Sequence, residues 1–375
     1  MIYFLLIPLL YILIQIWQLG VLRRYQSNPK HVFEWSQLPA VSIWVACRNE
    51  EKNLAACLDA LLRLDYPKEK IQILIGNDQS TDATRDIAMQ YALDYPNITL
   101  IDVVDTDSGL KAKARVMAQL DAHASGDYYL ITDADVRVKP NWIQGLLSNM
   151  TPEMGVCSGT TMVRSTGMDG WLQEIDWAYF MGLLNVISYS GVPATAVGNN
   201  MIIRREAYWQ TGGYGKIHFS ITEDYKLYSE VCAKGWKWNN IMNEDVLAFS
   251  EKTEGFGPLL HQRKRWLSGG KELPWYWWIL FGIYGGFYFV IPTLLVYFCW
   301  EAQITALLYL GVVWGVKFVL QSMQIRKIYA LVKEKAPRLE RLIVYELYLF
   351  VLTTLTALFF ILPIKTRWKS RSYKV

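Results

Sequence analysis

The sequence predicts an α/β domain joined to membrane-spanning helices. Between residues 40 and 140, short apolar runs rich in Val, Ile and Tyr alternate with helical stretches, which is typical of a parallel sheet covered by helices on both faces. Long, nearly uncharged runs near both ends of the sequence are long enough to cross a bilayer. Of the 375 residues 52% are hydrophobic and 19% charged, which is apolar for a soluble protein but too polar for a bundle of membrane spans alone.

The first apolar run, Ile2–Val21, predicts a transmembrane helix over residues 1–22. No basic residues precede it and no small-x-small cleavage site follows, so a removable signal peptide is not expected. Arg23 and Arg24 follow the run, which places its C-terminal end in the cytoplasm. We therefore expect an integral protein of the inner or plasma membrane whose α/β domain is cytoplasmic.

The α/β domain is expected over residues 38–255. Its predicted strands are Val41–Ala46, Ile71–Gly76, Ile98–Val104 and Tyr128–Thr132. The predicted helices between them are Asn53–Leu64, Asp82–Leu93 and Lys111–Ala124. A later helix is expected to begin at Thr222-Glu223-Asp224 and to run to about Ala233.

Polar clusters follow three of these predicted strands, at Arg48-Asn49-Glu50, at residues 77–82 and at Asp133-Ala134-Asp135. Ligands of parallel α/β sheets bind at the carboxyl ends of the strands, so the three clusters together predict a nucleotide site. Each cluster alone also fits a turn or a helix cap, and Ser80 or Asp82 is expected to be a cap.

Asp133 and Asp135 are the most informative pair. Two carboxylates one residue apart at a strand end point to the same place and repel each other unless a cation neutralises them. Oxygen ligands favour Mg²⁺ or Mn²⁺, and Mg²⁺ commonly binds one or two carboxylates plus substrate phosphates. An isolated Asp-x-Asp is more often a solvated turn, so this interpretation depends on the neighbouring clusters.

Two further motifs lie nearer the C-terminus. Thr222-Glu223-Asp224 fits an ordinary helix start, with Thr222 as cap and acidic residues in the first turn, although this account explains Asp224 less well than Glu223. In the segment 261–266, Gln262, Arg265 and Trp266 share one helix face. A guanidinium there suits a diphosphate and the Trp suits a sugar, whereas the alternative is a basic membrane-surface helix.

The chain becomes strongly apolar again after Pro274. We expect an amphipathic interface helix over 256–274, membrane segments over 275–363 and a basic tail over 364–375. The candidate spans are Trp275–Trp300, Ala302–Leu320 and Leu342–Leu362. The loop 326–341 and the tail after Lys365 are both basic and should both be cytoplasmic, yet one apparent span separates them. Either one segment lies in the interface or re-enters, or one basic stretch is outside.

Four motifs follow one another along the chain: Gly-Asn-Asp-Gln-Ser-Thr-Asp at 76–82, the Asp133/Asp135 pair, Thr-Glu-Asp at 222–224 and Gln-Arg-Lys-Arg-Trp at 262–266. Taken together, they resemble the motifs of membrane-integrated family 2 glycosyltransferases. That group includes polysaccharide synthases and lipid-glucosylating enzymes such as ceramide glucosyltransferase. The resemblance implies a GT-A fold, that is, a Rossmann-like nucleotide-diphospho-sugar transferase domain. It also implies inverting transfer from a nucleotide-diphosphate sugar, with UDP expected as the nucleotide.

The resemblance also implies roles for the donor-side residues. Glu50 and Asp78 match positions that hold the nucleoside, and Lys113 matches a basic residue of the same pocket, although Lys111 competes for this role. Asp133 and Asp135 match the motif for the metal ion and the diphosphate. Asn77 stands where many members have a second Asp.

On the reaction side, Asp224 matches the catalytic base. Gln262 and Arg265 match residues that close over the diphosphate, and Trp266 and Glu223 are expected on the acceptor side. A predicted helix carrying Trp171, Glu174, Asp176 and Trp177 could line that side, although ordinary packing explains these residues as well.

A membrane lipid is the expected acceptor, because few spans are available to form a polymer channel. A processive polysaccharide synthase is the first alternative, and a nucleotide-binding transporter or signalling protein without transferase activity is the second. The apparent spans contain few ionisable residues, which disfavours a transporter. The net charge of +4 is too small to indicate nucleic acid, and the basic clusters flank membrane segments, where anionic lipid is the natural partner.

Overall fold

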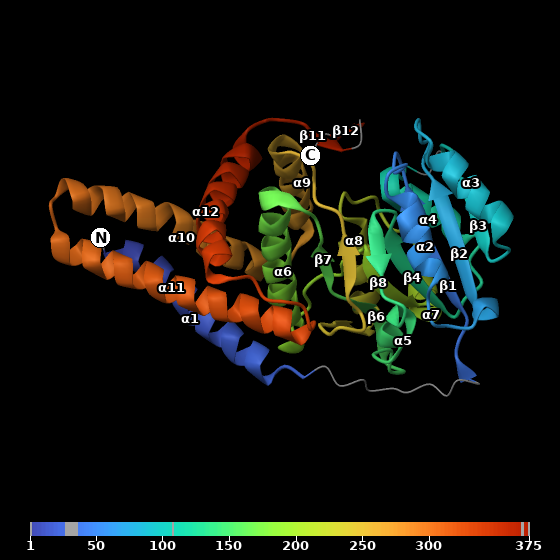
Figure 1. The fold of residues 1–375 in the computed structure, drawn as a ribbon, viewed down its shortest axis with the longest axis horizontal. Helices are drawn as coiled ribbons and strands as arrows, with labels where there is room; N and C mark the ends of the chain where they lie inside the picture. Colours follow the sequence, from blue (N-terminus) through green and yellow to red (C-terminus); the bar gives the residue numbers. More distant parts are fainter. Residues whose placement is uncertain (1, 27–36, 107–108, 369–370, 374–375) are drawn as a thin grey trace.

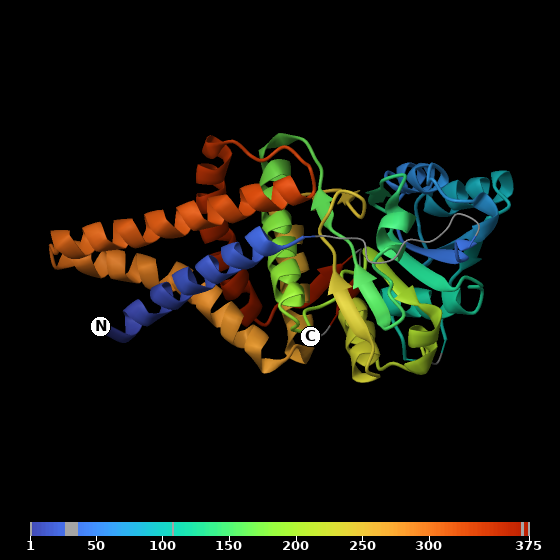
Figure 2. The same ribbon diagram turned by 90° about the horizontal axis from the view of Figure 1, so that it is seen from below.

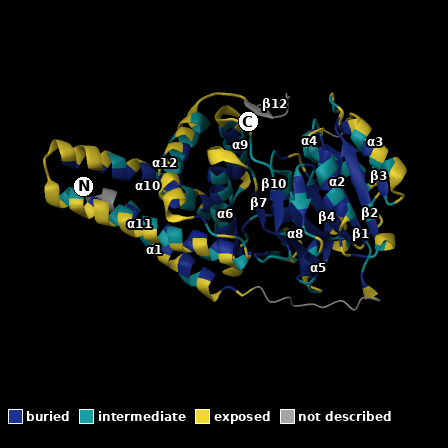
Figure 3. Cartoon of the chain, viewed as in Figure 1, coloured by how far each residue is buried: buried dark blue, intermediate teal, exposed yellow. Residues whose placement is uncertain are grey.

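The computed structural model describes residues 2–26, 37–106, 109–368 and 371–373. An α/β domain forms one end of the molecule, and apolar helices extend from it to the other end (Figure 1). Exposed residues, yellow in Figure 3, cover the parts of α10 and α11 that lie farthest from the domain. Such apolar exposed surfaces are expected where lipid surrounds the protein.

A seven-stranded sheet of order β3-β2-β1-β4-β8-β6-β9 forms the centre of the domain. Its strands are β1 (Val41–Cys47), β2 (Ile71–Asn77), β3 (Ile98–Asp102), β4 (Tyr128–Asp133), β6 (Met154–Ser158), β8 (Asn200–Arg204) and β9 (Lys237–Asn240). A smaller sheet of order β5-β10-β7 consists of Val136–Val138, Ala248–Ser250 and Thr161–Val163.

The helices of the domain are α2 (Leu54–Leu62), α3 (Thr84–Asp94), α4 (Ala112–Asp121), α5 (Trp142–Leu147), α6 (Gly167–Tyr189), α7 (Arg205–Gln210), α8 (Glu223–Ala233) and α9 (Phe256–Gly269), with short 3₁₀ turns at Lys68–Lys70 and Gly270–Glu272. They cover both faces of the sheet. Alternate residues of β1 belong to different cores: Ile43 and Val45 pack in one with α2, and Trp44 packs in the other with α4 and α8. Both faces of β1 are therefore buried, which explains its continuous apolar run.

The predicted fold class is confirmed, since β3, β2, β1 and β4 are parallel neighbours in the register expected of a doubly covered sheet. The four predicted strands end within two residues of the observed ones. The far half of the sheet differs, because β8 is antiparallel to both β4 and β6. Nothing local in the sequence predicts that pairing, since it joins segments about 70 residues apart.

In the part of the chain that the structure describes, four helices are long and apolar enough to cross a membrane: Leu6–Arg24 within α1 (Ile2–Arg24), α10 (Trp275–Trp300), α11 (Ile304–Leu331) and α12 (Leu339–Ile361). The expected end of the second C-terminal span at Leu320 is wrong. Helix α11 continues for eleven further residues, so Arg326 and Lys327 lie on a helix rather than in a loop. The reason is packing: Ile325, Ile328 and Tyr329 are buried in a core shared with α6.

Helix α12 is oriented differently from the other three apolar helices. Helices α1, α10 and α11 extend away from the domain, whereas α12 runs across their direction in both views (Figures 1 and 2). Both ends of α12 lie against the domain. Near its start, the Tyr345 hydroxyl donates to Asp176 of α6 (3.2 Å), and near its end the Lys264 amine of α9 donates to the Leu362 carbonyl (2.6 Å).

A buried ion pair connects α12 to the other apolar helices. The Lys317 amine of α11 lies 2.6 Å from one carboxylate oxygen of Glu346 in α12 and 2.6 Å from the Tyr288 hydroxyl of α10. After α12, the strands β11 (Thr366–Trp368) and β12 (Arg371–Tyr373) pair with each other, and β11 lies beside α9. Residues 369, 370, 374 and 375 of the predicted basic tail lie outside the described residues.

Candidate active site

The three polar clusters predicted at strand ends lie at one edge of the sheet. In the parallel register, Cys47 at the end of β1 pairs with Asn77 at the end of β2, and Ala46 pairs with Asp133 at the end of β4. The chain segments that follow these strands therefore leave the sheet side by side. This shared edge is where a parallel α/β sheet binds its ligand.

Glu50 and Asp78 are held in place by neighbouring groups. The Glu50 amide donates to the Thr84 hydroxyl (2.6 Å), and the Glu50 carboxylate accepts a hydrogen bond from the Asn53 amide (2.9 Å). Asp78 is 3% exposed and pairs with Arg115 of α4, with 2.6 Å between the charged atoms. The Arg115 pairing was not predicted, and it neutralises a buried carboxylate beside the proposed nucleoside pocket.

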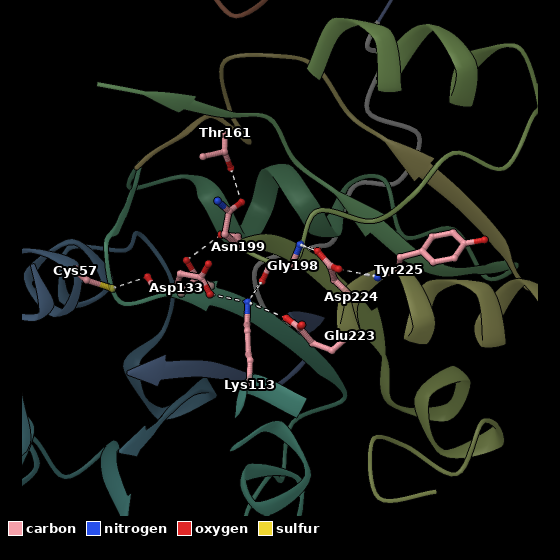
Figure 4. Close-up of polar contacts among 10 residues, drawn as sticks. Cys57, Lys113, Asp133, Thr161, Gly198, Asn199, Glu223, Asp224 and Tyr225 are labelled. Carbon is pink, nitrogen blue, oxygen red and sulfur yellow. Dashed lines mark hydrogen bonds and ion pairs between the residues drawn. The ribbon is translucent and has the colours of Figure 1, made fainter. Parts of the chain in front are cut away.

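Lys113 of α4 lies between the two acidic motifs (Figure 4). Its amine donates to the Asp133 carboxylate (2.5 Å) and to the Gly198 carbonyl (2.9 Å), and it lies 3.7 Å from the Glu223 carboxylate. Burial disfavours its charge, but the two carboxylates outweigh burial and raise the pKa of Lys113. The neighbouring Lys111 is exposed. The first carboxylate of the Asp-x-Asp motif thus has a fixed cationic partner.

Asp224 is positioned by backbone groups at the start of α8. One carboxylate oxygen accepts from the Gly198 amide (2.9 Å), and the other accepts from the Tyr225 amide (2.8 Å), as Figure 4 shows. A Cβ at position 198 would lie 2.8 Å from the Asp224 Cβ, closer than real Cβ contacts. Only glycine at position 198 lets the backbone approach Asp224 without displacing it.

Glu223 has a different environment from Asp224. Burial is the main reason that the pKa of Glu223 is raised to about 7, and the Asp224 carboxylate adds to this effect while Lys113 opposes it. Neighbouring carboxylates with different surroundings are common in sites that handle protons.

Helix α9 carries the segment 262–266 to the same site. Its end packs against the start of α8 so closely that a Cβ at Gly269 would lie 2.2 Å from the Thr222 side chain. Trp266 packs on Trp177 of α6, with 5.0 Å between ring centroids, and the Arg263 guanidinium lies 5.0 Å from the Trp266 ring. Arg263 also forms an ion pair with Asp176 of α6.

One cavity of about 1590 Å³ joins these groups. The predicted site residues all line it: Glu50, Asp78, Lys113, Asp133, Asp135, Glu223, Asp224, Gln262, Arg265 and Trp266. Asp176 and Trp177 of α6 line it too, whereas Glu174 accepts a hydrogen bond from Tyr329 (2.8 Å) and Trp171 lies 5.4 Å from the Arg341 guanidinium. Of the four residues considered on that helix, two therefore face the cavity.

Sequence reasoning missed several residues of the site. Gly198 lies between two predicted elements without a motif of its own, and only its contacts with Lys113 and Asp224 reveal its position. Arg115 could have been suspected, because it lies two residues after Lys113 on the same helix and close to the acidic clusters. Arg263 belongs to the quoted motif, but its pairing with Asp176 depends on the packing of α9 on α6.

The donor set of the site is compatible with a divalent cation that keeps part of its coordination for substrate. Among the residues that the structure describes, no group of three or more His, Cys, Asp and Glu side chains is arranged to hold a metal ion. The two carboxylates at 133 and 135 form an incomplete oxygen set, and one of them is already paired with Lys113. Such a set suits Mg²⁺ or Mn²⁺ with a diphosphate supplying further oxygens.

Comparisons with known proteins agree with this geometry. The family described as "Glycosyl transferase family 21" matches residues 1–375. A beta-monoglucosyldiacylglycerol synthase of Synechocystis sp. is 27% identical over 253 residues, covering 64% of this chain and 50% of the relative. A poly-beta-1,6-N-acetyl-D-glucosamine synthase of Staphylococcus aureus is 26% identical over 260 residues, covering 67% of this chain and 59% of the relative.

The chain thus spans between half and three fifths of the length of these two relatives. Among solved structures, the mannosyltransferase PcManGT from Pyrobaculum calidifontis, determined in complex with GDP-Man and Mn²⁺, is similar over 96% of both chains with a TM-score of 0.56 and 15% identity. At that identity the similarity supports the fold alone.

Proposed function

The chain belongs to glycosyl transferase family 21, and from this premise we propose that it transfers one sugar from a UDP-sugar to a membrane lipid with inversion at the anomeric carbon. Its family membership confirms the predicted class, a membrane-integrated glycosyltransferase of the ceramide glucosyltransferase-like kind. The transporter and signalling alternatives lose support accordingly. The observation that carries the proposal is the single cavity that runs from the strand-end carboxylates past Asp224 to the apolar helices.

The donor occupies the sheet edge. Glu50 and Asp78 contact the nucleoside, and their fixed geometry supports this role because neither side chain has to be ordered on binding. Arg265 and Gln262 of α9 close over the diphosphate, where a planar guanidinium binds two oxygens at once. The diphosphate of the donor in the Pyrobaculum calidifontis structure, GDP-Man, is the same chemical group.

Asp135 is the principal ligand for Mg²⁺ or Mn²⁺, and Asp133, oriented by Lys113, supports it. When bound, the cation would stabilise negative charge on the departing diphosphate. Lys113 and Arg265 add positive charge on the same side of the sugar, so the leaving group need not be protonated.

Asp224 acts as the base. Two backbone amides orient its carboxylate, which accepts the proton of the acceptor's hydroxyl group. The hydroxyl attacks the anomeric carbon from the face opposite the diphosphate, through an oxocarbenium-like state, which inverts the configuration. Trp266 provides an apolar face for the acceptor, while Glu223 borders it from the start of α8.

The lipid acceptor follows from the other end of the cavity, which lies among apolar helices. Three basic stretches that all lie next to the domain support a cytoplasmic location for it. Arg23 and Arg24 end α1 beside Tyr25, whose hydroxyl accepts from the Met242 amide of the domain (3.0 Å). The loop before α12 meets the domain through the ion pair of Glu334 with Arg164, and the segment after α12 lies by α9.

This arrangement also explains the contradiction in the charge pattern. If α12 lies in the plane of the membrane, its two basic flanks are on the same side, and α1, α10 and α11 are the three crossing helices. Accessibility of single cysteines introduced at Lys335 and Lys365 to a membrane-impermeant reagent tests this. Both should react only from the cytoplasmic side, and labelling from opposite sides would show that α12 crosses.

The function is tested with the purified chain in lipid nanodiscs, a panel of radiolabelled UDP-sugars, Mn²⁺ and extracted membrane lipids. The expected product is lipid plus one hexose or N-acetylhexosamine, soluble in organic solvent. Asp224→Asn should bind UDP-sugar normally and lose turnover on the order of a hundredfold or more. A water-soluble product of high mass would instead indicate a polysaccharide synthase, which the relative from Staphylococcus aureus is named as.

A further inference from the structure

Helices α10 and α12 both line the part of the cavity that lies among the apolar helices. On α10 the lining includes Trp278, Gly282 and Gly285, and on α12 it includes Thr356, Ala357 and Ile361. These are the two helices that run across each other in Figures 1 and 2, so they diverge on one side. Helices that cross at such an orientation cannot close the space between them along their whole length.

The space is larger than a donor needs. Pockets for small ligands usually measure about 300–1,000 Å³, whereas this cavity measures about 1590 Å³. The remainder is lined mainly by apolar groups beyond Asp224. A second ligand of apolar character fits that part better than water, because apolar cavities of this kind favour apolar contents.

On α10 the cavity lining contains two glycines among the aromatic residues Trp277, Trp278, Phe281 and Tyr284. Gly282 and Gly285 lie on one face of α10 at a spacing of three residues, and a Cβ at either position would have nothing within 4 Å. Gly286, on the other hand, packs against Ile7 of α1, where a Cβ would meet the Ile7 side chain at 3.3 Å. The open glycines therefore belong to the cavity rather than to helix–helix packing.

The cavity also reaches the surface that faces lipid. Its exposed lining residues include Trp278 near the start of α10, at 38%, and Ile361 at the end of α12, at 78%. Trp275, which is 73% exposed, begins α10 at the depth where Trp side chains prefer the membrane interface. The mouth is thus at the bilayer boundary, beside the headgroups.

We propose that the slot between α10 and α12 binds a long acyl chain of the acceptor lipid, which enters sideways from the cytoplasmic leaflet and passes Gly282 and Gly285 while its hydroxyl lies at Asp224. This inference rests on the proposed function and adds a binding site for the apolar part of the acceptor. In this proposal, helix α12 lies along the membrane boundary and forms the side of the slot opposite α10. Ceramide and diacylglycerol share the required chemistry, a hydroxyl headgroup on long chains.

The test compares acceptors of different chain length in nanodisc-reconstituted protein. Gly285→Leu adds a side chain in the slot, and because its Cβ would have no other atom within 4 Å, the fold should persist. Transfer to a palmitoyl ceramide or palmitoyl diacylglycerol should fall on the order of tenfold relative to transfer to the hexanoyl analogue. Gly315→Leu is the matched control: it lies on α11 with open space around its Cβ and does not line the cavity, so its ratio should equal that of the parent.

A second measurement does not depend on activity. The same two lipids with a photoactivatable diazirine on the acyl chain are added in phosphatidylcholine nanodiscs, and crosslinked peptides are identified by mass spectrometry. Crosslinks should concentrate on α10 and α12 near residues 282–285 and 353–357, and Gly285→Leu should reduce them. Labelling spread evenly over α1, α10 and α11, or an unchanged chain-length ratio in Gly285→Leu, would overturn the acyl slot.

The outcomes separate the two proposals. Crosslinks in the slot without any lipid product in the parent protein would leave the slot standing and refute the lipid transferase. Lipid product in the parent with crosslinks elsewhere would leave the transferase standing and refute the slot. Comparing the ceramide and diacylglycerol arms then shows which lipid the slot prefers.

Discussion

Replacing Gly198 by Ala tests how Asp224 is positioned. The new Cβ would lie 2.8 Å from the Asp224 Cβ and 3.0 Å from one of its carboxylate oxygens, whereas ordinary contacts begin at 3.4 Å. The Asp224 side chain or the backbone at position 198 therefore has to shift by a few tenths of an ångström. Since a misplacement of about 1 Å can cost about a hundredfold in rate, the Gly198→Ala variant should lose on the order of tenfold in turnover.

The assay is sugar transfer to lipid under saturating UDP-sugar, with nucleotide binding measured separately by calorimetry. Binding should stay within about twofold of the parent, because the substitution displaces the proposed base rather than the proposed nucleoside pocket. Gly215→Ala is the matched control, since a Cβ there meets nothing within 4 Å. It should retain both activity and binding.

A double-mutant comparison makes the reasoning refutable. If Gly198→Ala acts by displacing the base, it should cause little further loss in a protein that already carries Asp224→Asn. Independent, additive losses would show that Gly198 acts through something else, such as its carbonyl contact with Lys113. Full turnover of the single variant Gly198→Ala would show that the position of Asp224 is not critical.

Four further outcomes are expected. Asp135→Asn, or excess EDTA on the parent protein, should abolish most transfer while leaving the thermal unfolding midpoint unchanged, and full activity in EDTA would refute the metal assignment. Burial raises the pKa of Glu223 from its ordinary 4.5 to about 7. The folded protein therefore binds the Glu223 proton more tightly than the unfolded chain does. The stability that this proton contributes is fully present below pH 4.5 and is lost as the pH rises to about 7. In the Glu223→Gln variant, the thermal unfolding midpoint should therefore decrease less with rising pH between about 4.5 and 7 than in the parent. An unchanged dependence on pH would contradict the raised pKa of Glu223. Lys317→Met leaves the buried Glu346 without its cationic partner and should destabilise the protein by about 3–5 kcal/mol. Adding Glu346→Leu should recover most of this loss of stability, and an equal loss in the double variant would contradict this account. Trp266→Ala should raise the KM for the lipid acceptor more than that for UDP-sugar, and the reverse ranking in initial-rate measurements would place Trp266 on the donor side.

The sequence by itself determined the local elements and the chemistry at their ends. The strands Val41–Cys47 and Tyr128–Asp133 could be predicted because residues buried on both faces leave a continuous apolar run, which is visible without any tertiary contact. The carboxylates at 133 and 135 could be placed at the edge of the sheet for the same reason, since their position depends on where one strand ends. Four apolar helices were also evident from length and composition.

The tertiary structure decided how distant segments meet. Lys113 joins Asp133 to Glu223, and Gly198 approaches Asp224, through contacts between residues that lie 20 to 110 positions apart. The antiparallel insertion of β8 beside β4 likewise has no local signal, because one polar or apolar pattern fits either strand direction. The orientation of α12 also has no local signal in the sequence. Its apolar composition suits a membrane span, but contacts of its first half with α6 and Lys317 and of its C-terminal end with α9 set it across α10 and α11.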